Sequence, residues 1–476
     1  MTAKRIKLKR TILHAFVICL CLVFINATET VVLTPEELSE DLDQTQRELE
    51  ERAAYLKAVH ADYESVILSI RKKGTKGMTV DEFGLELKKV ISTLQDDHAK
   101  IIGFNLPEGS LPIQIESVKN RYIAFYPDHS DFVEPSFPFI TKIDGSTVEE
   151  WGRVLKPIIQ KGSPQFVKLH TLKMLSHIRL ARSMAGDAHD NTVTIELESR
   201  DGMEKKTVTL DVSDKELEVK LWPETESHLM EGNIGYLRIT GWHEEGLEEV
   251  KTWMPQFQNT EGLIIDIRDN PGGTRNVLRE LYPYFVKESD KPRVANVAKY
   301  RLFKEFERET MDSRHMFPQN WDGWNTAEQE AISDFIQEFI PEWIVPQEEF
   351  SEWHFWVLSK RSNPDAYYYP KPVVFLMNNK CFSASDVILS AVKGMPNVTL
   401  IGASSGGGSG AAIITTLKNS KLELRLSSMA SFQSSGKLFE GNGVDPDIAM
   451  EPEPEFFIKG GPDIVLKKGI QIITGR

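Results

Sequence analysis

Cysteine is scarce in this sequence of 476 residues, which contains only three. Cys19 and Cys21 lie in an apolar run near the N-terminus, so Cys381 is the only cysteine in the rest of the chain. A single cysteine cannot form an internal disulfide, and we expect a fold without disulfide stapling. No group of cysteine and histidine residues has the spacing of a zinc site, and we expect neither a metal nor another cofactor.

Positive charge is also in deficit, because 56 lysine and arginine residues stand against 70 aspartate and glutamate residues, a net charge of −14. Loss of residues 1–27 would remove five cations and no acid, which leaves about −19. Such a charge makes nucleic acid and anionic membranes poor partners. The composition, 41% hydrophobic and 26% charged, is ordinary for a globular protein, and the length predicts two to four domains.

The apolar run 11–25 is short for a membrane span, with about 15 residues where about 20 are needed. Five cations precede it, no acid appears before Glu29, and Ala27 is a small residue at a plausible cleavage point. This pattern predicts a secretory signal peptide over residues 1–27 and a secreted or periplasmic protein. An uncleaved anchor is the alternative, and it is the only membrane contact that we expect.

The next part of the chain, residues 28–104, is expected to be helical. A capping box at Thr34–Glu37 opens a charged stretch with helical spacing, which predicts a helix over 34–73. A second capping box at Thr79–Glu82 opens another helix. That helix runs out just before His98, which places this histidine in a loop, where functional residues are common.

Residues 105–215 are expected to form a small module rich in strands. Two strand-like runs flank Asp201-Gly202, which is a hairpin signal, and one helix is expected over 148–156.

From about residue 230, strands and helices alternate, which indicates an α/β sheet with βαβ crossovers over residues 216–476. Residues 286–370 interrupt this pattern and are rich in Trp, Phe, Glu and Pro, so we interpret them as an insertion or a lid. The expected elements of the sheet region are Ile234–Thr240, Glu244–Met254, Leu263–Ile267, Val373–Met377, a helix from about Ala384, and Val398–Ile401.

Several polar positions could carry chemistry, and each has a plainer reading. Ser383 follows a strand at the start of a helix, where a serine is either a nucleophile beside helix N-terminal amides or an N-cap. His98 is either a base or a solvated surface group, and the neighbouring Asp96 can cap a turn. The segment 270–273 either presents amides at the edge of the sheet or is a tight turn. The glycine-rich segment 404–410 lacks the Lys-Ser/Thr ending of a nucleotide loop, and it leaves room for a substrate backbone instead.

Taken together, four segments resemble those of the C-terminal-processing peptidases and their tricorn-core relatives, in the same order along the chain. They are Leu94–His98, Gly262–Gly273, Cys381–Asp386 and Glu440–Asp447. The resemblance covers roughly residues 80–450. It implies a crotonase-like α/β catalytic domain and, through Ile140–Gly145, a PDZ-like module within residues 105–215.

The same resemblance assigns residues to roles. It implies that Ser383 is the nucleophile and that the amides of Gly273 and Ala384 are the oxyanion donors. Many relatives have a glutamate where this chain has Asp386, which we interpret as a minor change.

The catalytic base separates two branches of these peptidases. The lysine of the C-terminal-processing branch falls on Gly408, and neither Lys418 nor Lys421 is an obvious substitute. In the tricorn-like branch, the histidine falls on His98 and the glutamate on Glu440. A serine hydroxyl needs a base, and a carboxylate fixes the tautomer of that base. The prediction is therefore a Ser383–His98–Glu440 triad.

The resemblance implies an exported serine endopeptidase that cleaves peptides or protein C-terminal regions through an acyl-enzyme. Two other functions fit the same residues. One is a non-catalytic binding protein on this scaffold, since a fold does not fix an activity. The other is an esterase or amidase for small molecules with the same triad. The sequence predicts no particular oligomeric state.

Overall fold

The computed structural model of the protein describes residues 31–218, 220–303 and 309–475. The predicted signal peptide, residues 1–27, lies outside the described residues. Val32–Arg476 form one unit by their contacts, and all elements below belong to it. Among the described residues, no helix has both the length and the apolar character that crossing a bilayer requires.

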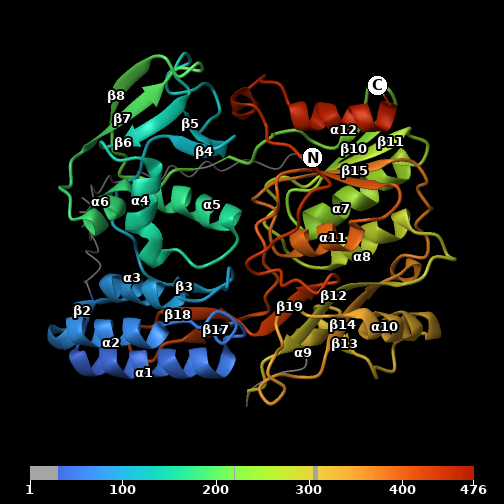
Figure 1. Ribbon diagram of the computed structural model, residues 1–476, viewed down its shortest axis with the longest axis horizontal. Helices are drawn as coiled ribbons and strands as arrows, with labels where there is room; N and C mark the ends of the chain where they lie inside the picture. The colour runs from blue at the N-terminus through green and yellow to red at the C-terminus, as the bar shows by residue number, and fades with distance from the viewer. Residues whose placement is uncertain (1–30, 219, 304–308, 476) are drawn as a thin grey trace, which may run out of the picture. The chain divides into compact units, whose positions relative to one another are not determined.

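The main sheet has six strands in the order β20-β16-β15-β11-β10-β9, and it runs through the upper right of Figure 1. All neighbours in it are parallel except β9, which is antiparallel to β10. Its strands are β9 (His228–Met230), β10 (Ile234–Arg238), β11 (Gly262–Asp266), β15 (Val373–Met377), β16 (Val398–Gly402) and β20 (Ile448–Ala449). The predicted α/β sheet is therefore present.

Helices cover both faces of the main sheet, which explains why β10, β11 and β15 are buried along their whole length. On one face lie α7 (Glu244–Trp253), α8 (Asn276–Leu281) and α11 (Ala384–Val392), and on the other lies α12 (Ile464–Thr474) (Figure 1). Alternate residues of each strand enter the two cores: Leu263 and Ile265 face the first group of helices, whereas Ile264 packs with Val465 of α12.

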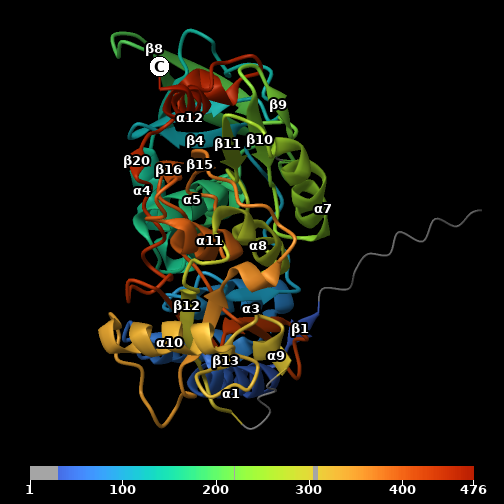
Figure 2. The ribbon, with the colours of Figure 1, turned by 90° about the vertical axis from the view of Figure 1, so that its right-hand side faces the viewer.

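A second sheet has the order β13-β14-β12-β19, and its first three strands come from the expected insertion. The described residues between 286 and 370 therefore build a packed layer with their own core, in which Ile332 of α10 contacts the sheet. Figure 2 shows α10 alongside β12 and β13. The elements are β12 (Arg293–Tyr300), α9 (Glu309–Asp312), β13 (Phe317–Pro318), α10 (Thr326–Glu338), β14 (His354–Leu358) and β19 (Met429–Gln433).

The N-terminal region is helical, but the single helix predicted over 34–73 is wrong. The chain forms α1 (Pro35–Arg52) and α2 (Tyr63–Lys73), and the segment between them turns into the interior. Ala54 donates its backbone N–H to the carbonyl of Ser427 at 2.8 Å, and Tyr55 is buried. These contacts with distant residues outweigh the local helical pattern.

Both predicted capping boxes are present, at Thr34 and Thr79. The second begins α3 (Val80–Ile91), and β1 (Val32–Leu33) pairs with β2 (Met78–Thr79) just before it. Beside α3 lies a three-stranded antiparallel sheet of β17 (Ala412–Thr416), β18 (Glu423–Ser427) and β3 (Lys100–Ile102). Because β18 and β3 are paired, the loop that carries His98 is attached to a C-terminal hairpin.

The module expected over 105–215 is a five-stranded antiparallel sheet in the order β4-β5-β6-β7-β8. The hairpin at Asp201-Gly202 is confirmed, with Thr192 opposite Asp211. The expectation of one helix is wrong, because three helices cover the sheet. The elements are β4 (Gln114–Val118), β5 (Arg121–Phe125), β6 (Phe139–Ile143), α4 (Val148–Leu155), α5 (Pro164–Leu175), α6 (Ile178–Ala185), β7 (Thr192–Glu198) and β8 (Lys205–Asp211).

Short 3-10 helices complete the chain at Gly74–Lys76, Lys156–Ile158, Met254–Phe257, Tyr282–Phe285, Lys360–Ser362 and Pro454–Phe457.

Candidate active site

Ser383 lies in the turn between β15 and α11, at the carboxyl edge of the main sheet. Its φ of 59° and ψ of −113° are rare for a residue other than glycine, and such strain is common at functional sites. Although Ser383 occupies the N-cap position of α11, its side chain makes no capping hydrogen bond. Its Oγ lies instead 3.2 Å from Nε2 of His98. The plainer interpretation as an N-cap therefore does not describe this serine.

His98 is buried rather than solvated, so its interpretation as a surface group is wrong. The neighbouring Asp96 holds the loop, because its Oδ1 accepts the backbone N–H of His98 at 3.0 Å and the hydroxyl of Ser427 at 2.7 Å. The imidazole ring packs against Phe382, with ring centroids 4.8 Å apart. Asp96 thus holds the loop and Phe382 holds the imidazole ring, and together these contacts direct Nε2 of His98 toward Ser383.

Glu440 is fully buried on the other side of the imidazole. Its Oε1 lies 3.7 Å from Nδ1 of His98, which is longer than a hydrogen bond. The carboxylate accepts the backbone N–H of Ser409 at 2.9 Å on Oε1 and the hydroxyl of Tyr55 at 2.6 Å on Oε2. The structure therefore brings Ser383, His98 and Glu440 together in the order of a triad. The contact between His98 and Glu440 is a few tenths of an ångström longer than a hydrogen bond. Catalytic hydrogen bonds are often long in the absence of substrate.

Tyr55 is a residue of this site that sequence reasoning missed. Its hydroxyl donates to Glu440 and accepts the backbone N–H of Ser431 at 3.0 Å. Burial, followed by the charge of Glu440, raises the pKa of Tyr55 well above its ordinary value, so the hydroxyl remains a donor. The segment Ala53–Tyr55 has an apolar helical pattern, and nothing in it distinguishes this tyrosine from an ordinary core residue.

The two candidate oxyanion amides, those of Gly273 and Ala384, belong to adjoining turns. Among the described residues, neither N–H has a hydrogen-bond acceptor in the protein. A Cβ on the intervening Gly272 would lie 2.7 Å from Cβ of Ser383, so the two turns approach each other as only glycine allows. Asn270 fastens them, because its carbonyl accepts the N–H of Phe382 at 3.1 Å.

The glycine-rich loop contains Gly408, the position at which the other branch has its lysine. A Cβ there would lie 3.3 Å from Cε1 of His98, so this position adjoins the imidazole. Buried Asp386 accepts the N–H groups of Gly407 and Gly408 at 3.2 and 3.1 Å. These amides are thus occupied by a protein carboxyl, whose pKa burial raises to about 8.

The two lysines of the neighbouring hairpin are directed elsewhere. Nζ of Lys418 lies 2.8 Å from Glu40, and Nζ of Lys421 donates to the carbonyl of Lys418 at 2.8 Å. Within the described part of the chain, no cluster of His, Cys, Asp and Glu could hold a metal ion.

Residues 233–450 match the model of peptidase family S41. The matched segment contains Ser383, Glu440 and both candidate oxyanion amides. Residues 233–450 form an S41 peptidase domain. The predicted resemblance is thereby confirmed at the level of the family, and His98 is supplied to the S41 domain by the chain that precedes it.

A carboxy-terminal-processing protease of Bartonella bacilliformis is 23% identical over 245 residues, which are 50% of this chain and 43% of that protein. The chain thus matches less than half the length of this relative. A crystal structure of mature CPAF and a structure of mature CPAF complexed with lactacystin each superpose with a TM-score of 0.65 at 16% identity. Each covers 93% of this chain, with 98% and 99% of the CPAF chain. At this identity the likeness shows the fold alone.

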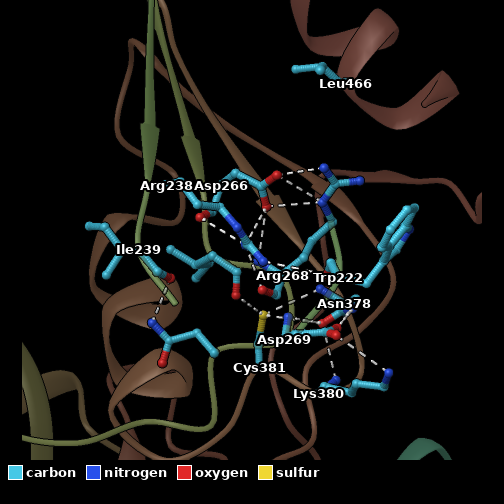
Figure 3. Close-up of polar contacts among 12 residues, drawn as sticks. Trp222, Arg238, Ile239, Asp266, Arg268, Asp269, Asn378, Lys380, Cys381 and Leu466 are labelled. Atoms are coloured by element: carbon cyan, nitrogen blue, oxygen red, sulfur yellow. Dashed lines mark hydrogen bonds and ion pairs between the residues drawn. The ribbon is translucent and has the colours of Figure 1, made fainter. Parts of the chain in front are cut away.

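A buried ion-pair network lies at the end of β11, just before the candidate oxyanion turn of the S41 domain (Figure 3). Figure 3 shows Arg238 and Arg268 directed at Asp266. The two ion pairs have N–O distances of 3.2 and 2.5 Å. Burial alone would raise the pKa of Asp266, but the charges of Arg268 and Arg238 outweigh it and lower the pKa to about 2. The carboxylate therefore stays charged and ties the ends of β10 and β11 together.

The same network reaches the turn before Ser383. Asn378 donates its side-chain N–H to Asp269 at 2.6 Å, and Lys380 lies 3.5 Å from the same carboxylate. Cys381, the only cysteine among the described residues, donates its thiol to the carbonyl of Ile267 at 3.0 Å, and burial raises its pKa. This cysteine therefore holds the turn and is not a free nucleophile.

A cavity of about 580 Å³ opens beside Phe382, the residue before Ser383, between the S41 domain and the five-stranded module. Phe382 and Pro271 line it from the S41 domain, and Ile113 and Leu172 line it from the module. Asp97, next to His98, reaches the same cavity and has no hydrogen-bond partner for either carboxyl oxygen among the described residues. Burial, followed by the nearby charges of Glu440 and Asp96, raises the pKa of Asp97 well above its ordinary value, which favours the neutral form of this carboxyl.

Proposed function

We propose that this protein is a serine endopeptidase that works through an acyl-enzyme. The observation that carries the proposal is the 3.2 Å approach of Ser383 Oγ to His98 Nε2 from a strained turn. In this mechanism Ser383 gives its proton to Nε2 while Oγ attacks the peptide carbonyl. The amides of Gly273 and Ala384 stabilise the negative oxygen, and Glu440 steadies the imidazolium. His98 then protonates the leaving amine, and water hydrolyses the ester.

The proposed substrates are peptides or flexible protein regions, and the five-stranded module is proposed to act as a PDZ-like peptide holder. Its strand β4 is at the edge of the sheet, and Gln114, Ile115 and Glu116 of this strand line the cavity beside Phe382. An edge strand can bind an extended peptide as an additional strand. A peptide bound in this way would lead into the cavity next to Ser383.

The experiment for this proposal compares turnover of peptides with turnover of small esters by the purified protein. We expect internally quenched peptides to be cleaved and the label of a fluorophosphonate to be incorporated. If the fluorophosphonate label is incorporated and small esters are hydrolysed rapidly but peptides are not cleaved, the esterase is favoured instead. Absence of both reactions in a folded protein would favour the non-catalytic binder.

We further propose that residues 1–27 direct export and are removed. The basic head before the apolar run supports this proposal. The expected mature N-terminus is near Thr28, which N-terminal sequencing of the protein from its native host would reveal. Recovery of intact residues 1–27 in a membrane fraction would contradict cleavage and favour the anchor.

Tyr55 is expected to act as a positioning residue through Glu440. Replacing Tyr55 with phenylalanine removes the donor to Oε2 and leaves a buried carboxylate oxygen unpartnered, which is unfavourable for the charged form. We expect kcat to fall about 10- to 100-fold with KM little changed, and the acid limb of the pH profile to move to higher pH. Kinetics between pH 5 and 9 would measure both effects.

Tyr369→Phe is a matched control for this substitution. Tyr369 is also fully buried, and its hydroxyl makes one hydrogen bond, with Thr260 at 2.7 Å, away from the site. Both variants should lose a similar part of the free energy of unfolding, on the order of 1 kcal/mol. If Tyr55→Phe lowers stability but leaves kcat and the pH profile like those of Tyr369→Phe, Tyr55 has only a structural role.

A further inference from the structure

Six cations from segments around the candidate active site have no carboxylate partner in the part of the chain that the structure describes. They come from six different segments and together form what we call the cationic band: Arg275, Arg314, Arg425, Lys100, Lys173 and Lys88. Among the described residues, none of them makes an ion pair. Nε of Arg425 is also buried without a hydrogen-bond acceptor. In a chain with a net charge of −14, six neighbouring cations without acids are unexpected.

The fold sets several of these cations next to one another and two of them, Lys100 and Lys173, in the cavity that Phe382 lines beside Ser383. Lys100 of β3 and Arg425 of β18 are direct partners in the antiparallel pairing of the two strands. Lys100 and Lys173 of α5 line the cavity that Phe382 also lines. At the other end, Arg275 follows the oxyanion turn and donates from Nη1 to the carbonyl of Arg314 at 3.1 Å.

Burial and the neighbouring positive charges both lower pKa values within the band. Burial, followed by the positive charges of Lys173 and Lys100, lowers the pKa of Lys88 to about 8. Burial, followed by the positive charges of Arg425 and Lys173, also lowers the pKa of Lys100. Burial, followed by the positive charge of Arg314, lowers the pKa of Arg275 to about 9.

The acids that line the same cavity do not neutralise the band. Burial raises the pKa of Asp97, which favours its neutral form. Glu116 and Asp269 are both paired with Lys380, at 2.6 and 3.5 Å, and Glu216 is exposed at the cavity edge. The contrast with Figure 3 is plain, since Arg238 and Arg268 there face Asp266 directly.

We propose that the cationic band binds carboxylates of the peptide substrate, so that the enzyme prefers acidic segments around the cleaved bond. This inference rests on the proposed peptidase function and adds the class of substrate. A carboxylate placed among the band relieves the repulsion and gains attraction from several cations at once. The same field orients an acidic peptide, while the remaining negative surface repels acidic chains from other sites. The carboxylates can belong to Glu and Asp side chains or to the C-terminus of the peptide.

The test uses pairs of internally quenched peptides that differ only in Glu or Gln at each position flanking the cleaved bond. Each pair is made with a free and with an amidated C-terminus. We expect kcat/KM to be about tenfold higher for Glu at one or more positions, or for the free C-terminus. The preference should shrink as NaCl rises from about 0.05 to about 0.5 M, because salt screens the attraction. A preference for Glu over Gln identifies side-chain carboxylates as the bound group. A preference for the free over the amidated C-terminus identifies the terminal carboxylate.

The double variant Lys100→Gln/Lys173→Gln should lower the ratio of kcat/KM for Glu and Gln peptides to about 1. Lys72→Gln is the matched control, since Lys72 is exposed on α2, has no ion pair among the described residues and carries the same charge. It should keep the preference.

If the wild type incorporates a fluorophosphonate and cleaves all the peptides at equal rates, the band does not select carboxylates and the inference is overturned. A preference that persists in the double variant would overturn it equally. Failure of labelling and cleavage together would instead contradict the peptidase function itself.

Discussion

Replacing His98 with alanine is expected to abolish fluorophosphonate labelling of Ser383 and to lower peptide turnover by roughly 10⁴- to 10⁶-fold, as in other triads. Among the described residues, the imidazole is the only side chain within hydrogen-bond distance of the Ser383 hydroxyl. Without it, the proton of the hydroxyl has no acceptor, and a neutral serine is a weak nucleophile. Labelling rates and single-turnover cleavage measure the two steps separately.

The matched controls for His98→Ala are Lys418→Ala and Lys421→Ala. Both lysines are exposed in the hairpin turn and contact Glu40 or the backbone rather than Ser383. Both variants should label and cleave like the wild type. A His98→Ala protein that is folded and fully active would contradict the proposed triad, and loss of activity in either lysine variant would point to a lysine base.

Replacing Gly273 with alanine is expected to lower turnover by roughly 100-fold or more, because it displaces one of the two proposed oxyanion donors. Gly273 has a φ of +145°, and a Cβ there would lie only 2.4 Å from the carbonyl oxygen of Trp242. The carbonyl of Trp242 is part of the backbone and cannot move away at little cost in energy. The turn that contains Gly273 must therefore move, and its N–H moves with it. We expect kcat to fall while KM changes little, since the donor acts on charge that develops in the transition state. Steady-state kinetics on one peptide would measure this.

Gly394→Ala separates this effect from simple backbone strain. Gly394 also has a positive φ, +77°, but a Cβ there would meet no atom within 4 Å. Both variants bear the strain of an L-residue in that region, and both should lose some stability. If Gly273→Ala is folded and turns over like Gly394→Ala, the segment 270–273 is a tight turn without a catalytic role.

The main sheet could be predicted from the sequence because its central strands are short, continuous apolar runs. Val373–Met377 is such a run, and the structure has β15 with the same bounds. Such runs arise where both faces of a strand are covered. The polar turns that follow them are then brought to one edge of the sheet. The pairing of Gly273 with Ala384, beside Ser383, came from the resemblance to the C-terminal-processing peptidases.

Other parts depend on contacts between distant residues and have no local signal. The break between α1 and α2 follows from contacts of Ala54 and Tyr55 with β18, Ser431 and Glu440, far along the chain. The helix α5 has apolar residues spread around its circumference, so its helical period is weak. The cationic band likewise joins six segments that no sequence spacing connects.

The most direct test of the central claim is to map the adduct of a fluorophosphonate by mass spectrometry of a proteolytic digest. The Ser383–His98 geometry predicts one adduct per chain, on Ser383, at a rate that falls to background in Ser383→Ala and in His98→Ala. An adduct on another residue, or no adduct on a folded protein that cleaves peptides, would contradict Ser383 as the nucleophile.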